Sequence, residues 1–165
     1  MKLILLGNAG SGKTTMARRV MGDRDISRLS LDEIAWIDRT PQRKPLKDSL
    51  RLLHEFISAN HEWIIEGCYG DLIEAALPHC AELRFLNPGV ETCVAHCRAR
   101  PFEPEKFATP ADQETMLERL IAWVRTYEMR DDELGLKRHR QLYESFQGRK
   151  KEYTSVDSYD AGPIR

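Results

Sequence analysis

The sequence feature that most constrains the fold is the glycine-rich segment Gly7-Asn8-Ala9-Gly10-Ser11-Gly12-Lys13-Thr14, which matches the pattern G-x-x-x-x-G-K-[ST]. An apolar run, residues 2–6, precedes it, and a stretch with helical spacing of apolar residues follows it. The order strand, glycine loop, helix is the context in which this pattern binds phosphate. The glycines let the backbone close around a phosphate chain that a Cβ atom would push away. The freed N–H groups and the positive end of the next helix would then face the anion.

The polar residues of this loop have expected roles at a nucleotide. We expect Lys13 to reach the β- and γ-phosphates and the Thr14 hydroxyl to ligate Mg²⁺. The predicted nucleotide-binding residues are those of the loop and the one that follows it: Gly7, Asn8, Ala9, Gly10, Ser11, Gly12, Lys13, Thr14 and Thr15. The alternative is a glycine turn that only links a strand to a helix.

Apolar runs alternate with amphipathic stretches along the chain, which predicts right-handed βαβ units and a parallel sheet covered on both faces. The expected strands are residues 2–6, 26–31, 63–65, 82–86 and 151–156. The expected helices are residues 13–21, 46–60, 71–77, 90–100, 111–129 and 131–147. Ligands of such sheets bind beyond the carboxyl ends of the strands, so the residues that follow each strand are the candidates for chemistry.

Two carboxylates follow predicted strands. Asp32 comes at the end of the second strand and could accept a proton from an acceptor hydroxyl, hold Mg²⁺ through water or cap the next segment. Glu66 follows the third strand and could stand near the metal, or be a surface residue in a turn. Thr14, Asp32 and Glu66 are therefore the candidate metal ligands, and Asp32 is also the candidate base.

Phosphoryl transfer also needs cations, because negative charge spreads over the moving group. With Lys13, the arginines expected to close over that group are Arg98 and Arg100 at the end of one predicted helix and Arg119 beyond the proline-rich loop 101–110. Arg98 and Arg100 could equally be favourable charges at a helix C-terminus. Other candidates are Arg39, Arg43, Lys44, Arg125 and Arg130.

Bulk properties narrow the class of protein. A length of 165 residues predicts one domain, and 25 basic against 26 acidic residues give no overall field that would steer the chain to nucleic acid or an anionic membrane. The apolar runs are too short to span a bilayer, and the chain begins directly with a predicted core strand. We therefore expect a cytoplasmic protein with reduced cysteines.

Some aromatic and sulfur-containing residues have two interpretations. Cys93, His96 and Cys97 share a predicted helix and could bind zinc, but the chain has no C-x-x-C pair, which favours core packing. Trp36 and Tyr69 flank strand ends and are candidates for stacking on a substrate ring, with core or pocket wall as the alternative.

The chain resembles the small phosphate-loop kinases, namely nucleoside monophosphate kinases, shikimate kinase and gluconate kinase. Within that group it is most similar to short adenylate-kinase-related proteins, the "DNA topology modulation" proteins. The segments that carry the resemblance are residues 7–14, 31–36, 62–69 and 83–86. It implies a three-layer α/β/α P-loop NTPase fold, with a five-stranded parallel sheet in the order 2-3-1-4-5, and it implies ATP with Mg²⁺.

The resemblance also implies a role for each of three segments of the chain. The segment from about residue 32 to 60 would bind the acceptor, residues 100 to about 119 would form a short lid with arginines on the ATP phosphates, and residues 156–160 would lie at the adenine. The chain departs from its relatives after the third strand, where Gly67-Cys68-Tyr69-Gly70 replaces the arginine-bearing sequence of nucleoside monophosphate kinases. Its adjacent acids, Asp32 and Glu33, and its lack of a glycine run differ from shikimate kinases.

Together these observations predict a phosphotransferase that moves the γ-phosphoryl group of ATP to an unidentified small molecule. The alternative is a nucleotide-dependent switch or slow ATPase that binds a partner, such as nucleic acid, through the basic segment 39–44.

Overall fold

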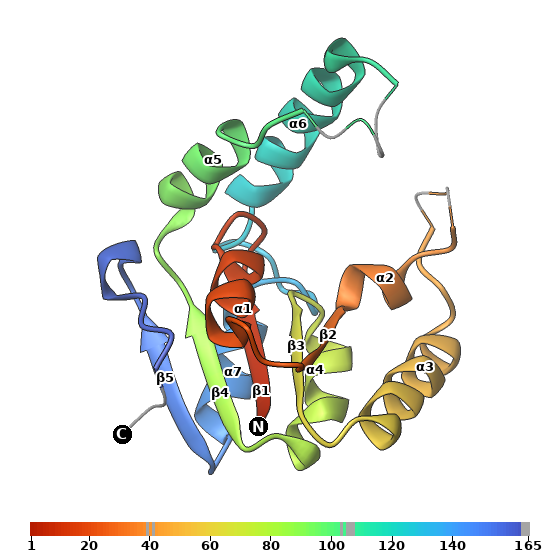
Figure 1. Ribbon diagram of the computed structural model, residues 1–165. Coiled ribbons are helices and arrows are strands. Elements are labelled where there is room, and N and C mark those ends of the chain that lie inside the picture. The colour runs from red at the N-terminus through yellow and green to blue at the C-terminus, as the bar shows by residue number, and fades with distance from the viewer. Residues whose placement is uncertain (39, 41, 103, 105–107, 163–165) are drawn as a thin grey trace.

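The chain folds into a five-stranded parallel sheet flanked by helices on both faces (Figure 1). The computed structural model describes residues 1–38, 40, 42–102, 104 and 108–162. The strands are β1 (Lys2–Gly7), β2 (Ser27–Ser30), β3 (Trp63–Gly67), β4 (Glu82–Leu86) and β5 (Arg149–Tyr153). Their order across the sheet, β2-β3-β1-β4-β5, confirms the expected topology.

Seven α-helices connect the strands within the described residues. They are α1 (Lys13–Met21), α2 (Leu31–Ala35), α3 (Leu46–Ala59), α4 (Gly70–Ala76), α5 (Val90–Arg98), α6 (Pro110–Arg125) and α7 (Leu136–Ser145), with short 3₁₀ turns η1 (Leu77–His79) and η2 (Val156–Ser158). None of the helices that can be described is both long enough and apolar enough to cross a bilayer.

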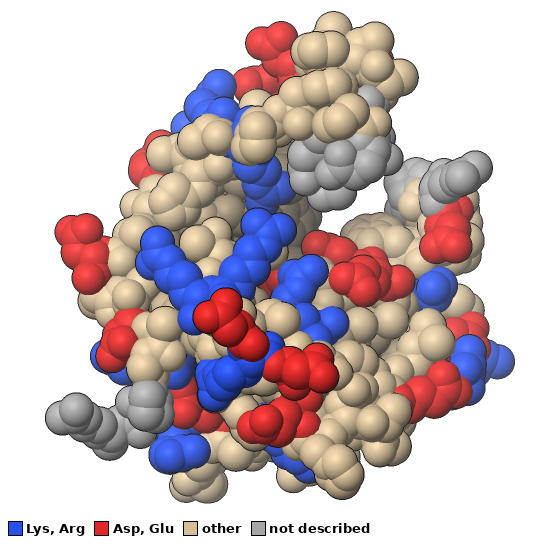
Figure 2. Space-filling view, viewed as in Figure 1, with Lys and Arg blue, Asp and Glu red and all other residues tan. Residues whose placement is uncertain are grey.

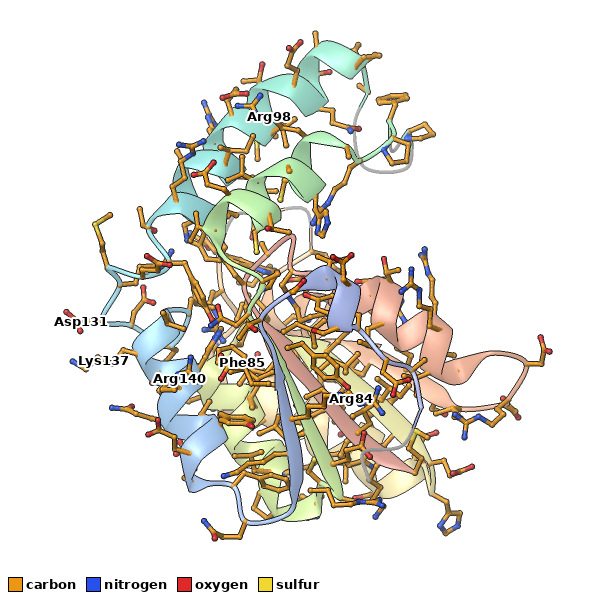
Figure 3. All side chains as sticks on the ribbon, turned by 90° about the vertical axis from the view of Figure 1, so that its left-hand side faces the viewer. Arg84, Phe85, Arg98, Asp131, Lys137 and Arg140 are labelled. Atoms are coloured by element: carbon orange, nitrogen blue, oxygen red, sulfur yellow. The ribbon has the colours of Figure 1, made fainter. Side chains whose placement is uncertain are left out.

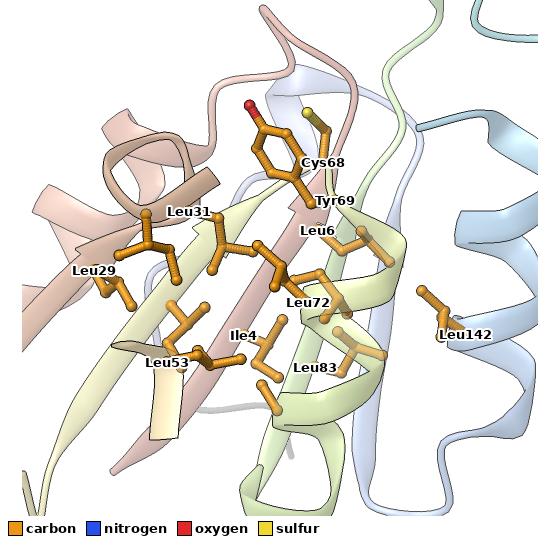
Figure 4. Close-up of a cluster of buried hydrophobic side chains, with 14 of the residues drawn as sticks. Ile4, Leu6, Leu29, Leu31, Leu53, Cys68, Tyr69, Leu72, Leu83 and Leu142 are labelled. Carbon is orange, nitrogen blue, oxygen red and sulfur yellow. The ribbon is translucent and has the colours of Figure 1, made fainter. Parts of the chain in front are cut away.

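Alternate residues of the central strands build two cores, because successive side chains of a strand point to opposite faces. On one face Ile4 and Leu6 pack with Leu53 and Leu72 from the helices (Figure 4). On the other face Leu3 packs with residues of α1 and with Tyr153 of β5. Burial on both faces explains why residues 3–6 of β1 are all apolar.

The strand register brings the candidate functional segments to one edge of the sheet. Leu6 of β1 stands beside Gly67 of β3, and Gly7 stands beside Leu86 of β4. Ser30, the last residue of β2, stands beside Glu66. The glycine loop, α2 and the turn after β3 therefore all leave the sheet at its carboxyl edge, where ligands of parallel sheets bind.

Helices α5 and α6 form an arm that projects beyond this edge (Figure 1). Cys93, Val94 and Cys97 of α5 pack against Ile121 and Val124 of α6 in a small core of their own. The predicted lid, residues 100–119, overlaps the tip of the arm, and its residues 103 and 105–107 lie outside the described part of the chain.

Two expectations about secondary structure are wrong. Residues 31–35 form a helix, α2, where the sequence predicts the end of a strand at residue 31 and no helix before residue 46. A helix of five residues is too short to show a period, although Asp32 and Glu33 in its first turn suit the positive end of a helix. The last strand begins at Arg149 and ends at Tyr153, earlier than expected, because β5 is a polar edge strand with little apolar signal.

Candidate nucleotide and acceptor site

The glycine loop has a backbone that only glycine fits. Gly10 and Gly12 adopt left-handed φ values of 78° and 92°. A Cβ atom on Gly10 would lie 2.3 Å from the carbonyl oxygen of Cys93, and one on Gly7 would lie 2.3 Å from that of Leu86. The N-terminus of α1 has no side-chain cap, so its first N–H groups are left for an anion.

Lys13 is held inside this loop. Its Nζ donates to the carbonyl oxygens of Gly7 at 2.9 Å and Asn8 at 2.7 Å and lies 3.5 Å from the Ser11 hydroxyl. Only 9% of the residue is exposed. The ammonium therefore places a buried positive charge where the loop closes, and phosphate oxygens could replace the carbonyl partners.

Three segments distant in sequence brace the loop. Asn8 donates from Nδ2 to the Val124 carbonyl of α6 at 3.2 Å, and the hydroxyl of Tyr159 donates to the Ser11 carbonyl at 2.6 Å. The Nδ1 atom of His96 in α5 lies 2.8 Å from the Gly10 carbonyl, which can only accept, so Nδ1 carries the proton. The sequence did not indicate these loop contacts of His96 and Tyr159.

A buried arginine fixes the segment that carries Tyr159. Arg84 of β4 is 1% exposed and pairs with Glu82 at 2.6 Å. Its guanidinium also donates to the carbonyl oxygens of Asp160 at 2.6 Å and Gly162 at 2.5 Å. Figure 3 shows Arg84 on the strand that faces this tail. The tail after β5 is thereby held next to the glycine loop, where the resemblance places adenine.

Thr14 and Glu66 meet at the end of β3. The Thr14 hydroxyl donates to Oε2 of Glu66 at 2.9 Å, and Arg28 of β2 pairs with Oε1 at 2.5 Å. Glu66 is 3% exposed and belongs to the strand, so its interpretation as a surface residue in a turn is wrong. A hydroxyl and a carboxylate are the hard oxygen donors that suit Mg²⁺. Among the described residues, no group of three or more His, Cys, Asp or Glu side chains is arranged to hold a metal ion. Cys93, His96 and Cys97 therefore do not form a zinc site.

Asp32 stands on the other side of the turn after β3, in the exposed first turn of α2. Burial raises the pKa of the Cys68 thiol to about 11, and the positive charge of Lys13 lowers that pKa while the negative charge of Asp32 raises it. Both charges therefore act on this turn from nearby, and Cys68 itself is a protonated thiol, unsuited to be a nucleophile. In Figure 2 acidic side chains line the α2 side of the hollow between α2 and the arm.

The aromatic pair at this side is engaged within the protein. The indole N–H of Trp36 donates to the Tyr69 hydroxyl at 2.6 Å, and that hydroxyl donates to Oδ1 of Asp32. Arg43 covers the Tyr69 ring at 4.9 Å and pairs with Asp71 at 3.3 Å. Tyr69 is 3% exposed, so the hypothesis that its ring stacks on a substrate is wrong.

A buried histidine supports the same turn from below. His139 of α7 is fully buried, and its Nε2 lies 2.8 Å from the Cys68 carbonyl while Nδ1 lies 2.8 Å from the Tyr127 hydroxyl. The carbonyl must accept, so Nε2 carries the proton and Nδ1 accepts from Tyr127. Burial lowers the pKa of His139 to about 4, so the ring is neutral near pH 7.

The structure does not bring the expected lid arginines to the loop. Arg98 pairs with Glu118 at 3.1 Å on the arm (Figure 3), and Arg100 and Arg119 are exposed. Within the described residues no hydrogen bond or ion pair joins these three arginines to the glycine loop. Their contact with phosphate stays a prediction. Arg39 lies outside the described residues.

Comparisons with known proteins agree with the topology. Similar solved structures are shikimate kinase from Acinetobacter baumannii in complex with shikimate (TM-score 0.54, 18% identity, covering 96% of this chain and 89% of that chain), a sugar kinase from Janibacter sp. (0.47, 17%, 81% and 82%) and shikimate kinase from Bacteroides thetaiotaomicron (0.46, 18%, 88% and 93%). No protein-family model matches the chain, and no curated protein matches it in sequence. The likeness shows the α/β/α fold of phosphate-loop kinases. The closer resemblance to "DNA topology modulation" proteins stays a prediction.

Proposed function

We propose that this protein is a phosphotransferase that uses ATP and Mg²⁺ to phosphorylate a hydroxyl group of a small molecule. The observation that carries the proposal is the glycine loop with buried Lys13 at the carboxyl edge of a kinase-fold sheet, next to a turn that Asp32 faces from the other side. A structural neighbour with this fold is a shikimate kinase, which supports the reaction class.

The residues have separate tasks in this proposal. The loop N–H groups and Lys13 bind the β- and γ-phosphates, and Thr14 and Glu66 would hold Mg²⁺, which supplies charge neutralisation when bound. Asp32 orients the acceptor hydroxyl and takes its proton as the oxygen bonds to the γ-phosphorus. The bond from that phosphorus to the β–γ bridging oxygen breaks, and the products are ADP and a phosphate monoester.

The arm would complete the site by closing over the nucleotide. Hydrogen bonds of Asn8 and His96 connect the two helices of the arm to the glycine loop. Phosphate binding in the loop and movement of the arm would therefore be coupled. Closure would bring Arg98, Arg100 or Arg119 toward the transferred group and exclude water.

The second candidate, a nucleotide-dependent switch with a nucleic-acid partner, has less support from the described residues. Of the basic segment 39–44 on which it depends, Arg43 is already occupied by Asp71 and the Tyr69 ring. A partner would therefore compete with contacts inside the protein.

An acceptor panel tests the two functions against each other. ADP formation from ATP and Mg²⁺ is measured with sugars, polyols, hydroxy acids, nucleosides and nucleotides. The proposal expects one chemical class to raise ADP formation in proportion to acceptor added, with one phosphate monoester formed per ADP. ADP formation that no compound of the panel raises, with ATP still bound, would favour the switch.

A further inference from the structure

Three side chains on the acceptor side form a hydrogen-bonded series with one possible direction. The Trp36 indole nitrogen can only donate, and it donates to the Tyr69 oxygen at 2.6 Å. The Tyr69 oxygen accepts this proton, so the single proton of its own hydroxyl goes to Oδ1 of Asp32. The series therefore ends on the residue that would take the acceptor's proton.

Tyr69 is held in place on several sides. Its ring is covered by the guanidinium of Arg43 at 4.9 Å, and Arg43 is anchored to Asp71 at 3.3 Å. The Trp36 ring meets it edge to face, with centroids 6.3 Å apart. Figure 4 shows Tyr69 at the margin of the buried cluster, with its hydroxyl directed away from the apolar side chains. A residue so fixed can define the position of its hydrogen-bond partner.

Arg43 and Lys44 are joined by their backbones to the end of α2. Trp36 and Arg43 form an antiparallel bridge, and the Lys44 N–H donates to the Ala35 carbonyl at 2.9 Å. The backbone next to Trp36 is thus joined to the backbone next to Arg43, so both residues that contact Tyr69 belong to one hydrogen-bonded unit.

Asp32 has little else to hold it. It lies in the exposed first turn of a five-residue helix, and in the described part of the chain Tyr69 is the one group that donates to its carboxylate.

We propose that Tyr69 is a positioning residue that orients Asp32, with Trp36 fixing Tyr69, so that Oδ2 is the atom offered to the acceptor hydroxyl. This inference rests on the proposed phosphotransfer, in which Asp32 is the base. Tyr69 does not touch the reacting atoms and acts through Asp32 alone.

A double-mutant cycle tests this role in turnover. Tyr69→Phe keeps the ring and its contact with Arg43 but removes the donor, so kcat for ADP formation should fall about tenfold while KM for ATP is unchanged. In an Asp32→Asn background the same change should have no further effect. The matched control is Tyr143→Phe, because the Tyr143 hydroxyl makes no hydrogen bond among the described residues. An equal loss of kcat in both backgrounds, or a rise in KM for ATP instead, would overturn the proposal.

A spectroscopic readout separates this inference from the proposed function. In a ¹⁵N–¹H correlation spectrum, Asp32→Asn should shift the Trp36 indole N–H signal through Tyr69, whereas Glu33→Gln, one residue away, should leave it in place. An indole signal that does not shift in Asp32→Asn would overturn the hydrogen-bonded series, even if the enzyme turns over. A shifted signal without any acceptor-dependent turnover would retain the series and contradict the phosphotransfer.

Discussion

The glycine loop and the acceptor side are built in opposite ways. The loop is contiguous in sequence, residues 7–14, and its own backbone forms the proposed phosphate-binding surface, while Val124, His96 and Tyr159 brace it from outside. The acceptor side consists of side chains from separate segments, with Asp32 from α2 and Tyr69 from the turn after β3. In the loop, a substitution that adds a side chain should disturb the fold of the site. On the acceptor side, an isosteric substitution should change the chemistry and leave the fold intact.

The largest effect should come from a change that removes chemistry on the acceptor side without moving the loop. Asp32→Asn is nearly isosteric and removes the proposed base, so kcat should fall by about 10²–10⁴-fold. KM for ATP should change by no more than a factor of about two, because the substitution leaves the residues proposed to bind ATP unchanged. Steady-state kinetics with the acceptor found by the panel measure both, with Glu33→Gln as control. Turnover of Asp32→Asn at the parent's rate would remove Asp32 as the base.

The next effect tests the claim that the loop is a backbone site. Gly10→Ala puts a Cβ atom 2.3 Å from the Cys93 carbonyl at a φ of 78°, so we expect a loss of about 3 kcal/mol in unfolding free energy and loss of ATP binding. Gly22→Ala is the matched control, because Gly22 also has a positive φ of 51° but open space around it, and should cost about 1 kcal/mol. Urea unfolding measures both. Equal losses in the two variants would contradict the close packing of the loop against α5.

His139, which is hydrogen-bonded to the turn between the two sides, should make the free energy of unfolding depend on pH. The pKa of His139 falls to about 4 on folding, below its unfolded value near 6.5, so the unfolded chain takes up the proton first. Its contribution is complete above about pH 6.5 and is lost as the pH falls toward 4, by at most about 3 kcal/mol. Urea unfolding of the parent, His139→Gln and the exposed-site control His61→Gln between pH 7 and 4.5 measures it. Parallel profiles for parent and His139→Gln would exclude the histidine as the source.

The smallest effect concerns the tie between the loop and the arm. Asn8→Ala removes the donor to the Val124 carbonyl and should lower the unfolding free energy by about 1 kcal/mol. Amide exchange in the last turns of α6 should become faster, which hydrogen-exchange mass spectrometry detects. Thr115→Ala, which removes a bond within α6 itself, serves as control. Unchanged exchange near Val124 in Asn8→Ala would show that the tie does not hold the arm.

The two regions also differ in how far the sequence predicts them. The loop and its flanking strand and helix follow from local patterns, because a glycine loop and a buried parallel strand are encoded by consecutive residues. The hydrogen bond from Tyr69 to Asp32 joins residues 37 positions apart and becomes visible only when β2 and β3 pair.

Local patterns also hide some residues that matter. Arg84 stands in an apolar run and gives no sign that it anchors the tail after β5. Arg98 occupies the predicted helix end but pairs with Glu118, an exposed acid of the neighbouring helix. Partners on neighbouring elements, rather than residue type, decide these outcomes.

The separation of a nucleotide side from a chemical side is tested most directly by titration calorimetry of ATP with Mg²⁺ into the parent, Lys13→Ala and Asp32→Asn. The charge and hydrogen bonds of Lys13 belong to the loop, so Lys13→Ala should weaken binding by about 10- to 100-fold. Asp32→Asn, and Lys47→Ala as a control that removes an exposed charge on α3, should bind ATP as the parent does. Parent-like binding by Lys13→Ala, or a loss in Asp32→Asn equal to that in Lys13→Ala, would contradict the account.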